Sequence, residues 1–261
     1  MSPNRLLSEM TWEDVKKAVE DNQVVVLPVA STEQHGQHLP LDTDAFLCFS
    51  VAVEAAKRSG HAIVAPPVVF GYSPHHMSFP GTITVDPHTL IKLLVEVTLS
   101  LAHHGFKKVL LLNGHGGNRG PLATAAIEAQ EKLNRKAKIA AASYFDFGIA
   151  KVSSTRDSEL GGMCHSCEYE TSLQLFLRPE LVRKEKIKRC MPPEVIKDYV
   201  SYDLLKPSVV SMALDTEEIS PESGVCGDPT LASAEKGRIF FNAVVDDIAE
   251  FLKKFCEFEV R

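Results

Sequence analysis

The sequence has no excess of basic residues and no uninterrupted apolar run of membrane-spanning length, and each absence excludes a class of protein. Lys and Arg number 28 against 34 Asp and Glu, for a net charge of −6, so the chain lacks the basic character of a nucleic-acid-binding protein. The longest stretch without charged side chains, 60–85, contains four Pro and three His and cannot form an apolar membrane helix. We therefore expect neither a nucleic acid nor a membrane as partner.

Cysteine is sparse, and the N-terminal segment has no apolar core. The six Cys are scattered and lack the density of a disulfide scaffold. Residues 1–9 do not resemble a secretory signal, so a cytoplasmic, reduced protein is expected. No internal repeat or low-complexity linker divides the 261 residues, and we predict a single domain over 1–261.

Short apolar runs alternate with helical stretches along the chain. Strands are predicted at 23–30, 62–70, 107–113 and 138–144, and helices at 44–59, 86–104, 120–134, 168–176 and 232–255. Asp86-Pro87 indicates a helix start and Gly60 a helix end, whereas 179–228 is expected to be irregular. This order predicts an α/β fold with a mostly parallel sheet covered by helices on both faces. Ligands of such sheets bind beyond the carboxyl ends of the strands.

Acidic residues and a histidine follow the first predicted strand. Glu33 and His35 are two residues apart and share a face if the segment is extended, and Asp44 opens the next helix. Carboxylates and imidazoles grouped at one strand end can bind a divalent metal. Taken singly, each of the three is also a common loop or capping residue.

A glycine-rich turn, Gly114-His115-Gly116-Gly117-Asn118-Arg119-Gly120, follows the third predicted strand. Such a turn could cradle a phosphate, which leaves a nucleotide-binding enzyme as an alternative. The glycine spacing departs from the dinucleotide pattern, and His115 at its centre favours a metal site.

Two further segments carry histidines. His165 and Glu168 are three residues apart, on one face of a helix if that helix extends back to His165. The adjoining Cys164 and Cys167 have no second Cys pair to complete a zinc site, so we interpret them as packing residues. The consecutive pair His75-His76 lies in a turn-rich loop after the second strand, and we expect at least one of the two, His76, to contact substrate.

Four blocks of sequence together resemble the creatininase (creatinine amidohydrolase-like) family. In chain order they are Ser31-Thr-Glu-Gln-His-Gly with Thr43-Asp44, Phe79-Pro-Gly-Thr82, Asn113-Gly-His-Gly-Gly-Asn118, and His165 with Glu168-Tyr-Glu-Thr-Ser172. The resemblance implies a three-layer α/β/α fold, two divalent ions per chain (Zn, Mn or Fe) and a homo-oligomer, commonly a hexamer.

The resemblance also assigns ligands. Glu33, Asp44 and His115 would hold one ion, with Asp44 bridging to a second ion on His35. Creatininases proper have a carboxylate two residues after the histidine of the glycine-rich turn, where this chain has Gly117; Glu168 is the expected replacement.

The expected reaction is hydrolysis of a C–N bond in a small cyclic amide or formamide by metal-activated water. Backbone N–H groups of Gly116 and Gly117 would stabilise the oxyanion, and His165 would protonate the leaving nitrogen. Creatininase covers its ligand with tryptophans, whereas the only Trp here is Trp12, which argues against creatinine. Other members act on a formamide, a short peptide or a keto-inositol, and these substrates stay open. A non-catalytic, metal-stabilised protein is a further alternative.

Overall fold

The computed structural model describes residues 5–194, 196, 198–206, 208–212 and 215–260. Residues 1–4, the beginning of the segment considered above as a signal, lie outside the described residues. Within the described part, no helix is both long enough and apolar enough to cross a membrane.

Four parallel strands form the central sheet, in the order β2-β1-β3-β4. Their bounds are Val24–Val29 for β1, Ala62–Val64 for β2, Lys108–Asn113 for β3 and Lys138–Ser143 for β4. Leu27 of β1 pairs with Leu111 of β3, so these two central strands end side by side. Three of the predicted strands are confirmed to within one or two residues.

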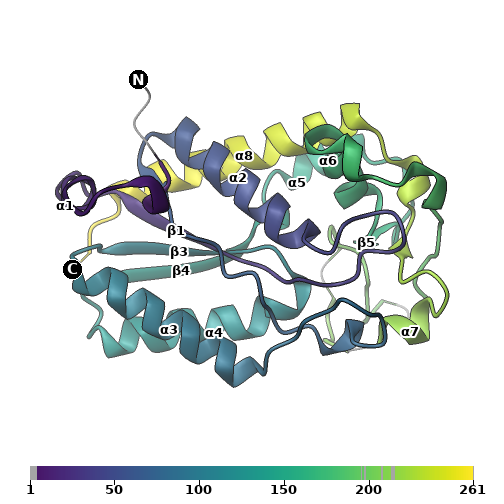
Figure 1. Cartoon of the computed structure of the whole chain (residues 1–261), viewed down its shortest axis with the longest axis horizontal. Helices are drawn as coiled ribbons and strands as arrows, with labels where there is room; N and C mark the ends of the chain where they lie inside the picture. The colour runs from purple at the N-terminus through teal and green to yellow at the C-terminus, as the bar shows by residue number, and fades with distance from the viewer. Residues whose placement is uncertain (1–4, 195, 197, 207, 213–214, 261) are drawn as a thin grey trace.

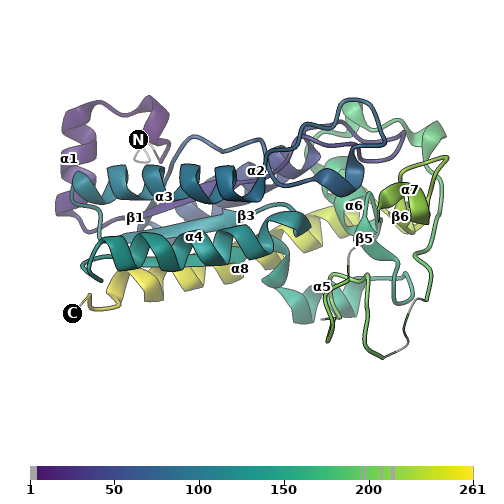
Figure 2. The same ribbon diagram turned by 90° about the horizontal axis from the view of Figure 1, so that it is seen from below.

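Helices cover both faces of this sheet and complete three layers. Helices α2 (Thr43–Ser59) and α8 (Ala234–Glu257) lie on one face, and α3 (Pro87–His103) and α4 (Arg119–Lys132) on the other (Figures 1 and 2). All six residues of β1 are buried, and alternate side chains enter two separate cores. Val26 packs in the core with α2 and α8, and Leu27 in the core with α3 and α4. The predicted α/β class is thereby confirmed.

Local signals set the helix ends. Gly60 has φ 74°, the left-handed conformation that ends α2, and the Asp86 carboxylate accepts a hydrogen bond from His88 N–H at 2.8 Å to begin α3.

The predicted strand at 62–70 is wrong beyond Val64. Pro66 and Pro67 carry no N–H group and cannot donate to the sheet, so β2 ends at Val64. Contact with β1 resumes only at an isolated bridge between Val29 and Val68, where Val68 N–H donates to Pro28 O at 2.9 Å.

The remaining elements gather at the two ends of the molecule. Helix α1 (Trp12–Glu20) lies at one end, and α6 (Glu168–Leu177), α7 (Thr216–Ile219) and the antiparallel pair β5 (Met163–His165) and β6 (Cys226–Gly227) lie at the other (Figure 1). Helix α5 (Ile149–Thr155) packs on α8. The sequence analysis did not predict α1, α5 or β5. Most of the described residues of 179–228 are irregular as expected, apart from α7, β6 and short turns.

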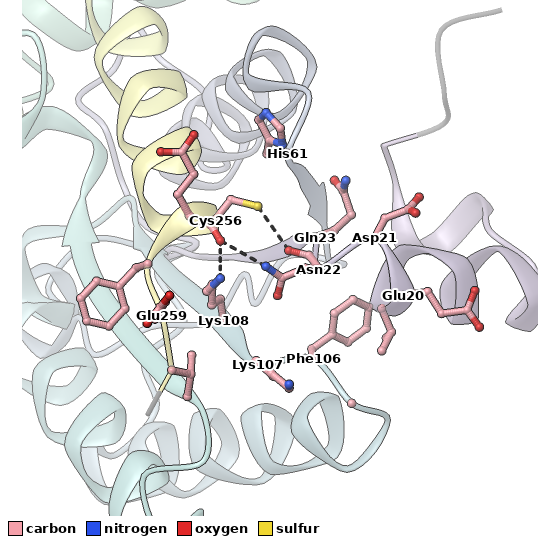
Figure 3. A pocket seen from close by; sticks show the side chains of 15 residues that line it. Glu20, Asp21, Asn22, Gln23, His61, Phe106, Lys107, Lys108, Cys256 and Glu259 are labelled. Atoms are coloured by element: carbon pink, nitrogen blue, oxygen red, sulfur yellow. Dashed lines mark hydrogen bonds between the residues drawn. The ribbon is translucent and has the colours of Figure 1, made fainter.

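A cavity of about 820 Å³ opens at the amino ends of the strands, where Asn22, His61 and Lys108 line it together with the 256–260 tail (Figure 3). Asn22 Nδ2 donates to Cys256 O at 3.2 Å, which ties the end of α8 to the loop before β1. The residues predicted to bind metal follow the carboxyl ends of the strands instead.

Candidate metal centre

Glu33, His35 and Asp44 meet beyond the carboxyl end of β1. Glu33 and His35 have no solvent exposure, and Asp44, near the start of α2, is only 3% exposed. His35 Nε2 lies 3.1 Å from Asp44 Oδ1. Ligand atoms of the three residues all lie within 4.8 Å of one another. The expectation that these side chains converge is therefore met.

His115 joins the same cluster from the glycine-rich turn after β3. The Asn113 side chain braces the turn by accepting from His115 N–H at 3.0 Å and donating to His115 O at 2.7 Å. The ring Nδ1 lies 3.1 Å from Glu33 Oε2 and 3.1 Å from Asp44 Oδ2, while Nε2 lies 3.1 Å from Tyr72 O. Because a carbonyl only accepts, Nε2 carries the proton, and Nδ1 faces the two carboxylates.

Strand β5 and helix α6 add two more side chains to the cluster, His165 and Glu170. His165 ends β5, and its ring centroid lies 4.3 Å from that of His35 and 4.1 Å from that of His76. Glu170, in the first turn of α6, places Oε1 3.7 Å from His35 Nε2. Ser166, with φ 54°, makes the turn between strand and helix. His35, His165 and Glu170 form a second group of closely spaced ligand atoms.

Glu168 does not reach the cluster, and this corrects the expected ligand set. Its carboxylate accepts from Asp157 N–H at 3.0 Å and Ser158 N–H at 2.9 Å, and lies 2.5 Å from Lys236 Nζ. Residues two apart on a helix point about 200° apart around its axis, so Glu168 and Glu170 cannot face the same site. The carboxylate that faces His35 is that of Glu170.

Gly117 has no room for the carboxylate that the resemblance described above leads one to expect at this position. A Cβ atom on Gly117 would lie 2.3 Å from Tyr72 O and 2.6 Å from His115 Nε2. A Cβ on Gly116 would meet nothing within 4 Å, so Gly116 borders open space. Both glycines lie in the short turn Gly116–Asn118 beside the cluster.

The two histidines of the 71–82 loop lie against the cluster. His76 is 3% exposed, with Nε2 3.3 Å from Glu33 Oε1. The ring of His75 stacks on that of His115 at 5.4 Å with a 7° interplanar angle. From the same loop, Ser73 Oγ donates to Glu33 Oε2 at 2.6 Å. Sequence reasoning missed Ser73 and Glu170; for Glu170, its place two residues after Glu168 in the matched block was an available signal.

The electrostatics of the cluster fit divalent cations. Within the described residues, the ion partners of Glu33, Asp44 and Glu170 are histidines, with no Lys or Arg among them. Glu33 Oε1 and Asp44 Oδ2 are buried and accept no hydrogen bond from a described residue. A donor set of carboxylate oxygens and imidazole nitrogens suits zinc and manganese. A lone pair on His115 Nδ1 directed at two carboxylates is favourable when a cation lies between them.

The pKa values of the histidines follow this arrangement in the metal-free chain. Burial lowers the pKa of His115, but the carboxylates of Glu33 and Asp44 outweigh it and raise the pKa to about 10. For His165, burial followed by the charges of His76 and His35 holds the pKa well below its usual value. At neutral pH the His115 ring is therefore protonated and positively charged, and its charge lies where a metal cation would bind. The His165 ring is neutral.

Known proteins are similar in sequence to most of this chain. The family described as "Creatininase: Creatinine amidohydrolase" matches residues 8–252. A mycofactocin precursor peptide peptidase from Mycobacterium tuberculosis is 35% identical over 85% of this chain and 82% of its own length. A 3-dehydro-scyllo-inosose hydrolase from Thermotoga maritima is 30% identical over 95% of this chain and 82% of its own length.

Solved structures give the same result at the level of the fold. A crystal structure of creatinine amidohydrolase superposes with a TM-score of 0.82 at 28% identity, over 97% of this chain and 98% of that one. A manganese creatininase matches with a TM-score of 0.81, and a creatininase variant of Zn–Zn type with 0.80; both are 28% identical over at least 96% of this chain and 98% of their own.

Proposed function

Because the chain belongs to the creatininase family, we propose that it is a hydrolase that holds two divalent metal ions and cleaves a C–N bond of a small amide. One observation carries the proposal: five side chains from four separate segments converge, buried and without a Lys or Arg partner among the described residues. They are Glu33, His35, Asp44, His115 and Glu170.

The two oxygens of Asp44 support a bridging role. Oδ1 faces His35 and Oδ2 faces His115, so one carboxylate can serve two ions. We assign Glu33, Asp44 and His115 to one ion, and His35, Asp44 and Glu170 to the other. Glu170 replaces Glu168 in this set because Glu168 is bound to Lys236 and to two backbone N–H groups.

The bound ions would supply an acidified water and polarise a carbonyl. His165 lies neutral against the cluster, so it would accept the proton released by the attacking water and pass it to the leaving nitrogen. The N–H groups of Gly116 and Gly117 are proposed to donate to the carbonyl oxygen as negative charge develops on it. His76 borders the same space and would contact substrate.

The substrate class proposed is a small cyclic amide or a formamide. A short peptide is the second candidate, favoured because the peptide peptidase of Mycobacterium tuberculosis is 35% identical to this chain, more than the creatininase structures at 28%. A keto-inositol is a third, on the likeness to the inosose hydrolase. The nucleotide alternative is disfavoured, since His115 of the Gly114–Gly120 turn faces Glu33 and Asp44, which would repel a phosphate.

The test is a matched pair of variants, Glu170→Gln and Glu168→Gln, with metal counted by ICP-MS on protein purified without an affinity metal column. We expect two ions in the native chain, fewer in Glu170→Gln, and two in Glu168→Gln. Equal metal in both variants would reject Glu170 as a ligand, and no metal in the native chain after reconstitution would reject the function. Hydrolysis of creatinine, hydantoin-like rings, formamidopyrimidines, short peptides and keto-inositols would then be measured with the matched metal.

If metal is bound but hydroxamates do not displace a water from it, the ions serve structure alone. We also propose a homo-oligomer, a hexamer as is common in the family, which light scattering coupled to size exclusion would test.

A further inference from the structure

Gln34 lies between two proposed ligands, Glu33 and His35, and its own amide contacts two other histidines. The residue is 5% exposed. Its Nε2 lies 3.0 Å from His76 Nδ1, 3.0 Å from His165 Nε2 and 2.9 Å from Gly224 O. One side chain therefore joins the 71–82 loop, strand β5 and the loop before β6.

The orientation of the Gln34 amide is fixed by its backbone partners. Oε1 accepts from Gly36 N–H at 2.9 Å, and Nε2 donates to Gly224 O. A flipped amide would set an NH₂ group against the Gly36 N–H and an oxygen against the Gly224 carbonyl, which loses both bonds. The donor end of Gln34 therefore faces the histidines.

The main-chain carbonyl of Gln34 determines the tautomer of His165. His165 Nε2 lies 2.8 Å from Gln34 O, and a carbonyl only accepts, so Nε2 carries a proton. In the neutral ring, Nδ1 then holds the lone pair. This atom lies 3.7 Å from Glu33 Oε1, on the side of the metal cluster.

Counting hydrogens then determines the tautomer of His76. The Gln34 amide has two hydrogens; one goes to Gly224 O, and the protonated Nε2 of His165 cannot accept the other. His76 Nδ1 is the remaining acceptor, and the hydroxyl of Thr216, whose Oγ1 lies 2.5 Å from the same nitrogen, must then donate to it as well. The proton of His76 consequently sits on Nε2, 3.3 Å from Glu33 Oε1.

We propose that Gln34 is a positioning residue that sets both tautomers. The lone pair on His165 Nδ1 then faces the cluster, where it can accept a proton and pass it to the substrate, and the N–H at His76 Nε2 faces Glu33. The proton-transfer part of this statement rests on the proposed hydrolase function. The tautomers themselves rest on the hydrogen-bond geometry alone. Ligand atoms of Glu33, His76 and His165 also lie within 4.8 Å of one another, but a proton on Nε2 of His76 would remove that nitrogen from the metal donors.

The first test needs no variant. Zinc-loaded protein labelled with ¹⁵N-histidine is examined by long-range ¹H–¹⁵N correlation, which distinguishes a protonated ring nitrogen from one with a lone pair. We expect a protonated Nε2 and a lone-pair Nδ1 for both His165 and His76. A protonated Nδ1 on either ring would overturn the inference. Zinc counted on the same sample tests the proposed function separately, because missing zinc would contradict that function and not the tautomers.

The second test asks whether Gln34 is the cause. Gln34→Glu keeps an acceptor for Gly36 N–H but removes the donor, so the proton of His76 should move to Nδ1. Gln37→Glu is the matched control: it makes the same change three residues on, at an exposed side chain, and should alter neither ring. Thr216→Val should also leave both tautomers unchanged. A folded Gln34→Glu protein with an unshifted His76, or a shift produced by Thr216→Val, would overturn the assignment to Gln34.

Discussion

The Nε2 atom of His115 lies 3.1 Å from the carbonyl oxygen of Tyr72, and this contact leaves Nδ1 as the nitrogen that faces Glu33 and Asp44. A backbone carbonyl on one loop thereby presents a ring nitrogen on another loop to the two carboxylates that are proposed to bind metal. The arrangement belongs to a common pattern in which the second nitrogen of a metal-binding histidine is held by a hydrogen bond.

Metal uptake should release protons. In the metal-free chain the carboxylates of Glu33 and Asp44 raise the pKa of His115 to about 10 against the effect of burial, so the ring is charged at neutral pH. A metal must displace that proton, and affinity should therefore rise with pH by roughly tenfold per unit for each proton displaced, until the pH passes the raised pKa. Calorimetric titration of metal-free protein with zinc, in two buffers of different ionisation enthalpy, counts the protons. An affinity that does not change between about pH 6 and about pH 9 would contradict this expectation.

Removal of the metal should lower stability. Ions that bind the folded chain alone stabilise it by about 4 kcal/mol when their free concentration is about a thousandfold above Kd. Without them, the buried carboxylates of Glu33, Asp44 and Glu170 have only histidines as ion partners among the described residues. We expect a chelator to lower the thermal midpoint and stoichiometric zinc to restore it. An unchanged midpoint, with metal loss verified by ICP-MS, would show that the site does not stabilise the fold.

Lys236→Met should lower the free energy of unfolding but leave the metal content unchanged. Glu168 is fully buried, and Lys236 supplies its only cationic partner among the described residues, with 13% of the lysine side chain exposed. Loss of that partner leaves a buried carboxylate uncompensated, for a cost of about 3 kcal/mol. Lys254→Met on the same helix α8 is the control, because Lys254 is 73% exposed and should change stability by less than about 0.5 kcal/mol. Chemical unfolding measures both, and equal effects would refute the structural role given to Glu168.

Gly117→Ala and Gly116→Ala should differ sharply. The added methyl group at 117 would lie 2.3 Å from Tyr72 O and disturb the contact that orients His115, whereas at 116 it would enter open space. We expect Gly117→Ala to lose about 1–3 kcal/mol and part of its metal, and Gly116→Ala to retain both. For the same reason Gly117→Glu should not restore metal to Glu170→Gln. Metal content and the unfolding midpoint decide both points; full metal in Gly117→Ala would mean that the turn adapts.

Local rules explain why much of the fold was predictable. The apolar run of β1, the left-handed Gly60 and the Asp86-Pro87 helix start depend on adjacent residues, and each matched the structure closely. Glu33, Asp44 and His115 could be grouped for a related reason, since parallel strands bring the residues that follow them to one edge of the sheet.

The choice between Glu168 and Glu170 depends on residues far away in the chain. Both lie in the first turn of α6 and both are buried, so local sequence treats them alike. What separates them is Lys236, which α8 brings against one face of α6. The early end of β2 has a local cause, because Pro66 and Pro67 cannot donate to the sheet. The short strands β5 and β6 are defined mainly by their pairing with each other, which local sequence does not reveal.

The residue proposed to move the proton and the residues proposed to hold the metal belong to different parts of the architecture. His165 ends the two-stranded β5–β6 ribbon, whereas Glu33 and His115 follow strands of the central sheet. Between the two strands of the ribbon lie α6 and a segment whose described residues contribute no strand to the central sheet. Selection could therefore exchange that segment, and with it the substrate, while the proposed metal ligands that follow the sheet strands stay in place. A single scaffold would in this way serve a range of chemistries as wide as that of its peptidase and inosose hydrolase relatives.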